Sequence, residues 1–351
     1  MNRIPYYYFS LFLLMSFTSL AQFTTIVQHD GTSIKNQQKT GTCWSFSTVS
    51  FLESEIIRLG GPELDLSEMY IVSKIYEDKA LNYILRQGTA QFSQGSLAHD
   101  MLSAYDRFGI VPESVFSGRA DEEKAYNHSQ LLEGLSKVVK KAVSDQQAPK
   151  DWLAAFRAVL AEEGMYYDDQ YFYLNDIEWT PESFARALPL DPDDYMHFTS
   201  FTHHPFYERF VLEIPDNFSN GSYQNVPMQE LLEITHYALD HGMTLTWDGD
   251  VSEDGFDAQK GWAKYEGPEI SQIQRQKEFL TLTTTDDHLM HLVGKATDEE
   301  GHGYFIIKNS WGPIGPFEGY LYMSEEYFLM KTVGLTVHKE GVPQRILNNI
   351  K

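Results

Sequence analysis

The chain has a single cysteine, Cys43, among its 351 residues. Because no second thiol is present, no internal disulfide can form, and the fold must be held together by a buried core. The composition allows such a core, since 42% of the residues are hydrophobic and 14% are aromatic. The length leaves room for one large domain or for two lobes that share a cleft.

The N-terminus has the pattern of a secretory signal peptide. Arg3 is followed by an almost wholly apolar run at 6–17, and Ser19-Leu20-Ala21 provides small residues for a signal peptidase. A permanent membrane helix needs about 20 apolar residues, so this run is too short. We expect residues 1–21 to be removed near Ala21, leaving an exported protein, periplasmic or secreted, that is not attached to a membrane. A buried N-terminal helix is the alternative.

Export makes the lone thiol informative, because secreted proteins usually pair their cysteines. It is either an inert buried thiol or a nucleophile. Apolar residues recur at helical spacing over 43–59, and Gly60-Gly61-Pro62 then ends the predicted helix. Cys43 is therefore expected at a helix N-terminus, where the helix dipole stabilises a thiolate and free backbone N–H groups can bind an oxyanion. Gly41 would permit a tight turn before it.

A cysteine nucleophile needs a base and a group that orients the base. Twelve histidines are present, so residue chemistry alone does not select one. His288 opens a strand-like run, and a second run at 304–308 leads into Asn309, so neighbouring strands could hold imidazole and carboxamide together. Trp311 could shield their hydrogen bond from water. Taken singly, His288 and Trp311 could equally be core residues, and Gln37 could be a solvated loop residue or an oxyanion donor.

Helical patterns come first in the chain and strand patterns later, which indicates the α+β class. The aromatic, proline-rich segment 166–225 has no clear periodicity and is expected to pack rather than to cage a ligand. Predicted helices cover 43–59, 67–77, 97–108 and 229–240, with two or three more in 120–165, and predicted strands cover 243–247, 288–294, 304–308, 319–323 and 333–338.

Three segments resemble those that carry the catalytic residues of papain-like cysteine peptidases. They are Asn36–Phe46, Asp287–Met290 and Lys308–Gly312, and they occur in the family's order. The resemblance implies that Cys43 is the nucleophile, His288 the general base and acid, and Asn309 the residue that orients it. It also implies an oxyanion hole made by Gln37 and the Cys43 N–H, and it implies no cofactor.

The implied fold has two lobes, a helical lobe with the cysteine and a β-barrel-like lobe with the histidine and asparagine. In the secreted papain branch these two residues follow the cysteine by about 130–150 residues, and here they lie much further along. The chain resembles instead the bleomycin hydrolase and aminopeptidase C branch (peptidase family C1B). The segments that carry this likeness are 107–114, 241–247 and 320–328.

This branch implies an aminopeptidase that hydrolyses peptide bonds through a Cys43 thioacyl-enzyme, and it allows for a homo-oligomer. We expect a helical lobe at about 36–118, a largely helical insertion at about 119–225 and a β-rich lobe at about 226–340, within one peptidase domain at 22–351. Gly95, in the loop Ser93-Gln94-Gly95-Ser96, is expected to offer its backbone to substrate, and Trp311 to border the site. The branch's long C-terminal arm restricts cleavage to free N-termini, and the C-terminal segment here is expected to be too short to do so.

Other functions stay open at this stage. An endopeptidase or transpeptidase of the same fold would use the same residues, and a non-catalytic scaffold would bind peptides without cutting them. A metal site is not expected, because His288 and His291 would face opposite sides of a strand and His203-His204 lack further ligands. The formal charge of −23 argues against nucleic acid and anionic membranes as partners.

Overall fold

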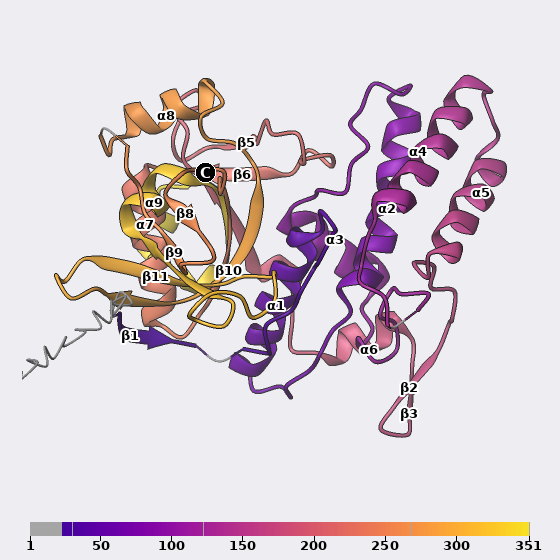
Figure 1. Ribbon diagram of the computed structural model, residues 1–351, viewed down its shortest axis with the longest axis horizontal. Helices are drawn as coiled ribbons and strands as arrows, with labels where there is room; N and C mark the ends of the chain where they lie inside the picture. The colour runs from indigo at the N-terminus through magenta and orange to yellow at the C-terminus, as the bar shows by residue number, and fades with distance from the viewer. Residues whose placement is uncertain (1–22, 30, 122, 268, 351) are drawn as a thin grey trace, which may run out of the picture.

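The structure is a computed structural model that describes residues 23–29, 31–121, 123–267 and 269–350. The predicted signal peptide lies outside the described residues. Figure 1 shows two unlike halves, with helices α2, α4 and α5 on one side and the strands of a large sheet on the other. None of the helices in these ranges combines the length and apolarity that a bilayer span requires.

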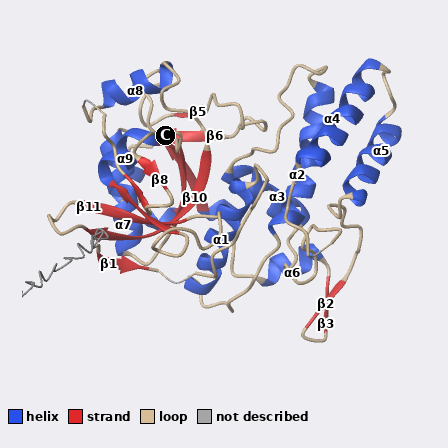
Figure 2. Ribbon diagram, in the orientation of Figure 1, coloured by secondary structure: helices blue, strands red, loops and turns tan. Residues whose placement is uncertain are grey.

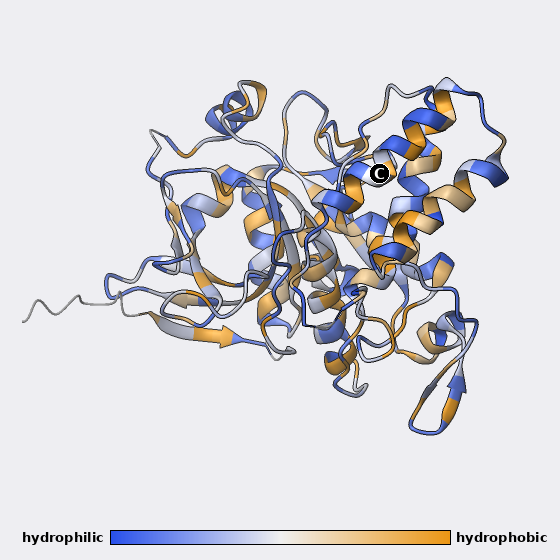
Figure 3. Ribbon diagram, turned by 45° about the vertical axis from the view of Figure 1, so that its right-hand side comes forward, coloured by the Kyte–Doolittle hydropathy of each residue, from blue (hydrophilic) through white to orange (hydrophobic). Residues whose placement is uncertain are grey.

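The helical half is built around one hydrophobic cluster that includes Trp44, Tyr76 and Phe156. Residues in 129–188 pack into the same cluster, and Figure 3 shows hydrophobic and hydrophilic residues alternating along the helices they form. Its elements are α1 (Cys43–Arg58), α2 (Glu68–Leu85), α3 (Ala98–Phe108), α4 (Ser129–Ser144), α5 (Pro149–Glu162), the hairpin β2 (Phe172–Leu174) and β3 (Ile177–Trp179), and α6 (Pro181–Ala187).

The other half is a mainly antiparallel sheet, drawn in red in Figure 2. Its strands run in the order β5-β6-β4-β13-β7-β10-β11-β12-β9-β8, and β1 pairs with the far end of β10. The strands are β1 (Thr24–Gln28), β4 (Tyr195–Thr199), β5 (Arg209–Val211), β6 (Ser222–Asn225), β7 (Leu245–Gly249), β8 (Phe256–Asp257), β9 (Trp262–Ala263), β10 (His288–Thr297), β11 (Gly303–Lys308), β12 (Tyr320–Ser324) and β13 (Thr332–His338).

This sheet stays open, because β5 and β8 lie at opposite ends of its strand order. The predicted barrel-like lobe is in this respect wrong, although the predicted α+β class is confirmed. The helices on this half are α7 (Met228–Asp240), α8 (Gln272–Leu280), α9 (Glu325–Lys331) and α10 (Gln344–Leu347), with 3-10 turns η1 (Pro192–Asp194) and η2 (Lys339–Gly341).

The two halves meet where α1 packs against β10. A buried polar network crosses this junction. Lys308 Nζ at the end of β11 donates to Ser50 Oγ at 2.7 Å and to Thr32 Oγ1 at 3.2 Å. Ser50 also bonds His291 Nδ1 at 2.9 Å, and Thr32 donates to Glu53. The helix that begins at the cysteine is thereby tied to the strand that leads into the predicted orienting asparagine.

Candidate active site

Cys43 is the first residue of α1 and is 9% exposed. The backbone N–H of Leu289 donates to its sulfur. The sulfur therefore lies at the first residues of β10, immediately beside the strand position that His288 occupies. The hypothesis of a Cys–His pair across the two lobes requires the sulfur to lie close to His288. The packing of α1 against β10 brings the two residues together.

His288 and Asn309 are held together as the sequence predicts. The His288 Nε2–H donates to Asn309 Oδ1 at 2.8 Å, and the Ser310 backbone N–H donates to the same oxygen at 2.7 Å. Two donors on one oxygen fix the orientation of the amide, so Nε2 carries the proton in the neutral ring and Nδ1 is left as the base. The Trp311 ring stacks on His288 with centroids 4.6 Å apart and planes at 28°, where it shields this hydrogen bond.

Burial disfavours an isolated charge on either member of the Cys43–His288 pair. Burial raises the pKa of the Cys43 thiol to about 12, and burial lowers the pKa of His288 to about 4. A lone thiolate and a lone imidazolium are therefore both unfavourable. Charge can separate only if the sulfur's proton moves to the ring, because the pair as a whole then stays neutral. The reactive form of the pair is therefore reached by proton transfer within it, from the Cys43 sulfur to the His288 ring.

Gln37 is buried and fixed rather than solvated. Its Nε2 donates to Thr40 O at 2.7 Å, and its Oε1 accepts from Ser310 Oγ at 2.7 Å. These two hydrogen bonds hold the Gln37 side chain between the loop before Cys43 and the segment after Asn309. A primary amide has two N–H groups, so one can serve Thr40 while the other faces a developing oxyanion.

Gly41 has a role other than the predicted tight turn. The positive φ in this loop belongs to Gln38, at 54°, and not to Gly41. Gly41 instead lies against Gln94, whose Oε1 accepts from the Gly41 N–H at 2.7 Å and whose carbonyl accepts from Trp44 Nε1 at 3.0 Å. The small residue allows the predicted substrate loop to approach the nucleophile segment.

Gly95 lies in that loop, and its carbonyl accepts from Lys79 Nζ. A Cβ on Gly95 would collide with the carboxylate of Asp216. Asp216 comes from a distant loop at 212–221, and it also accepts from Gln91 Nε2 at 3.1 Å. Sequence reasoning did not single out Asp216, because nothing in its neighbourhood of the chain indicates that this loop reaches Gly95.

Two further aspartates missed by the sequence analysis stand close to the nucleophile. Asp248 on β7 and Asp286 have their carboxyl groups in hydrogen-bonding contact, and with Asp216 they raise the pKa of the Cys43 thiol by their charge. Asp248 is 4% exposed. An acidic residue inside the otherwise uncharged strand 245–249 was the sequence signal that could have revealed it.

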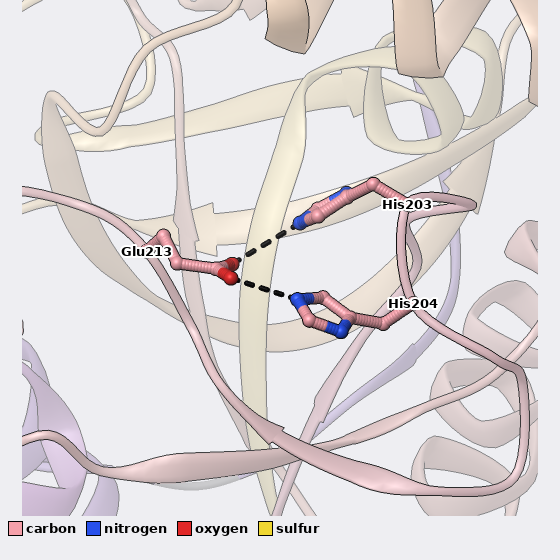
Figure 4. Close-up of side chains that lie close together, drawn as sticks. All are labelled: His203, His204 and Glu213. Carbon is pink, nitrogen blue, oxygen red and sulfur yellow. Dashed lines mark hydrogen bonds and ion pairs between the residues drawn. The ribbon is translucent and has the colours of Figure 1, made fainter.

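His203 and His204 do have a carboxylate neighbour, which the sequence analysis missed. Glu213 accepts from His203 Nε2 at 3.1 Å and from His204 Nε2 at 2.7 Å (Figure 4). The three ligand-type atoms lie within 4.8 Å of one another. Hydrogen bonding accounts for these contacts without a metal ion.

The matches to known families cover both halves. Residues 162–351 match the model of the peptidase C1-like family, and residues 25–176 match that of papain family cysteine proteases. The chain belongs to the peptidase C1-like family. This confirms the resemblance inferred from the three catalytic segments, and it makes the protein a papain-like cysteine-type peptidase.

Relatives place this peptidase C1-like protein near bacterial aminopeptidases. Aminopeptidase W of Lactobacillus delbrueckii subsp. lactis is 24% identical, with 93% of this chain and 86% of that protein aligned. Aminopeptidase C of the same organism is also 24% identical, over 92% and 83% of the two chains. The crystal structure of pepW from Lactobacillus rhamnosis matches with a TM-score of 0.72 at 18% identity, covering 93% and 84%, which confirms the fold.

Proposed function

We propose that the catalytic groups of this cysteine-type peptidase are Cys43, His288, Asn309 and Gln37, and that it removes residues from free peptide N-termini. The observation that carries the assignment is the meeting of the Cys43 sulfur with the start of β10, where His288 is already bonded to Asn309.

In the proposed reaction the sulfur attacks the scissile carbonyl carbon while its proton passes to His288 Nδ1. The Cys43 N–H and the Gln37 amide stabilise the oxyanion. The imidazolium then protonates the leaving amine, and the C–N bond breaks to leave a thioacyl-enzyme. Water, deprotonated by the same ring, releases the acyl product and restores the thiol. Asn309 keeps the ring in one tautomer throughout.

The aminopeptidase specificity is supported by the names of the relatives, which are aminopeptidases W, G and C. The last described helix, α10, packs beside α7, where Arg345 bonds Glu233 and, at 3.0 Å, Glu230.

Export is part of the same proposal. The charged, apolar and small-residue regions of 1–21 support secretion through a cleaved signal peptide, and the peptide substrates would then be extracytoplasmic. Edman sequencing of protein recovered from culture medium or periplasm should begin near Gln22. Recovery of the intact N-terminus from the cytoplasm alone would contradict export.

A digest of a defined peptide library, read by mass spectrometry, tests the activity. We expect stepwise loss of N-terminal residues from free peptides, no cleavage of Nα-acetylated ones, and no cleavage by Cys43→Ser. Internal cuts in acetylated peptides would show an endopeptidase. Intact peptides with a correctly folded protein would indicate a binding scaffold.

A further inference from the structure

Three carboxyl groups gather beside the nucleophile. Asp248 and Asp286 face each other, and Asp216 reaches the same place from 212–221, where its backbone N–H donates to Asp286. Each of the three carboxylates acts on the Cys43 thiol through its charge. This cluster is separate from the groups that carry out proton transfer.

Asp248 is buried without donors. It is 4% exposed, yet neither of its oxygens accepts from an N–H or O–H group in the described part of the chain, and the same holds for Asp286 Oδ2. Buried carboxylates normally collect several donors, and one without donors must hold a proton or a cation. Burial raises the pKa of Asp248 well above its usual range, and burial together with Asp216 raises the pKa of Asp286 to about 7.

The nearby lysine does not fill this place. Burial raises the pKa of Asp216, and the charge of Lys79 offsets only part of this shift. The Lys79 Nζ donates to the Gly95 carbonyl and to Ser93 Oγ at 3.2 Å. It therefore holds the 93–95 loop in position. Among the described residues, no lysine or arginine therefore donates a hydrogen bond to Asp248 or to Asp286 Oδ2. A cation that binds this pair of carboxyl groups has to come from another molecule.

We propose that Asp248 and Asp286, with Asp216 at their edge, form a subsite for a cationic nitrogen group of the peptide substrate. That group is the free α-amino group or the side chain of a lysine or arginine. It would replace the proton shared by the two carboxyl groups with charge-assisted N–H···O bonds. This inference rests on the proposed function, since it makes the cluster a specificity determinant next to Cys43.

The position of Asp216 connects the subsite to the substrate. Its carboxylate lies against Gly95, whose backbone is expected to bind substrate. A cationic group seated beside Asp216 would therefore lie along the path of the bound peptide.

Binding to the Cys43→Ala variant tests the inference without turnover. Isothermal titration would compare lysyl-alanine amide, its Nα-acetyl derivative and norleucyl-alanine amide. At least tenfold weaker binding on acetylation would assign the subsite to the α-amino group, and a similar loss with norleucine would assign it to the side chain. Equal affinities for all three peptides would overturn the proposal, whether or not the active enzyme cleaves them.

Matched variants then locate the subsite. In the Cys43→Ala background, Asp248→Asn and Asp286→Asn should each weaken the cation-dependent part of binding at least tenfold, and exposed Asp254→Asn should not. Asp286→Asn carries the test if Asp248→Asn fails to fold. The same loss in Asp254→Asn, or unchanged binding in both site variants, would overturn the assignment. Strong cation-dependent binding by an enzyme that cuts no peptide would instead contradict only the proposed function.

Discussion

At the scale of single residues, Asn309 orients the His288 ring through hydrogen bonds and without an ion pair. Its Oδ1 accepts from both His288 Nε2 and the Ser310 N–H, so the ring is fixed by hydrogen bonds in a site whose burial opposes a charged imidazole. This pair could be proposed from the resemblance of the segments that carry it and from their order in the chain. The Ser310 N–H that sets the amide's orientation has no counterpart in such a pattern and could not be foreseen.

Removing that amide should impair catalysis more than folding. In Asn309→Ala the ring loses its fixed tautomer and orientation, and kcat/KM should fall by roughly 100-fold, at the lower end of the range that general acid–base groups contribute. Steady-state kinetics on a fluorogenic aminoacyl substrate measures this. Asn349→Ala, at an exposed position of the last described segment, should behave as the unchanged protein. Equal activity in both variants would contradict the orienting role.

Asp286 should make stability depend on pH. Its pKa is raised to about 7 in the folded chain, above about 4 for an unfolded aspartate. The folded state therefore binds more protons over this interval, and stability is full below about pH 4 and declines as pH rises through 7. Asp286→Asn should remove that decline, making the variant more stable than wild type by about 1–2 kcal/mol at pH 8 but not at pH 4. Urea unfolding at both pH values would decide, and a stability difference independent of pH would be inconsistent with this account.

At the scale of elements, periodicity identified the helices and strands that carry the catalytic groups. α1, α3, α7, β10, β11 and β13 lie within a few residues of their predicted bounds. α2 runs eight residues beyond its predicted end, to Leu85. β4, β5 and β6 were missed in 166–225, because prolines and aromatics there conceal the alternation of buried and exposed side chains. Their pairing depends on partners such as β13, which lie far away in the sequence.

The buried polar network that joins α1 to β11 can be disrupted by a single substitution. Burial lowers the pKa of Lys308 to about 8, and burial raises that of Glu53 to about 7. Lys308→Met removes the hydrogen bonds of Nζ to Ser50 and Thr32 and leaves their buried hydroxyl groups without this donor, so it should cost about 2–3 kcal/mol of unfolding free energy. Denaturant unfolding measures the loss.

A matched control lies on the neighbouring strand. Lys295 on β10 pairs at 2.6 Å with Asp240, which is exposed. Lys295→Met should therefore cost no more than about 1 kcal/mol, as exposed ion pairs do. If both variants lost the same stability, the buried network would not be what ties the nucleophile helix to the asparagine strand.

At the scale of the whole molecule, the sequence predicted the family, the two-part architecture and the residues proposed for catalysis. It could not predict the acidic cluster, because Asp216, Asp248 and Asp286 come from three distant segments that only the folded sheet and loops bring together. The family resemblance implied a barrel-like lobe, whereas the sheet stays open. Closure depends on strand number and stagger, which the resemblance of short segments does not fix.

The central claim is that Cys43 is a nucleophile made reactive by its pairing with His288. Labelling with the epoxide inhibitor E-64, followed by intact-mass spectrometry, tests it directly because the chain has no other cysteine. We predict one inhibitor per molecule, bound to Cys43, with labelling at least 100-fold slower in His288→Ala. Labelling of the unaltered protein no faster than that of an exposed small-molecule thiol, or equal rates in the two proteins, would contradict the account.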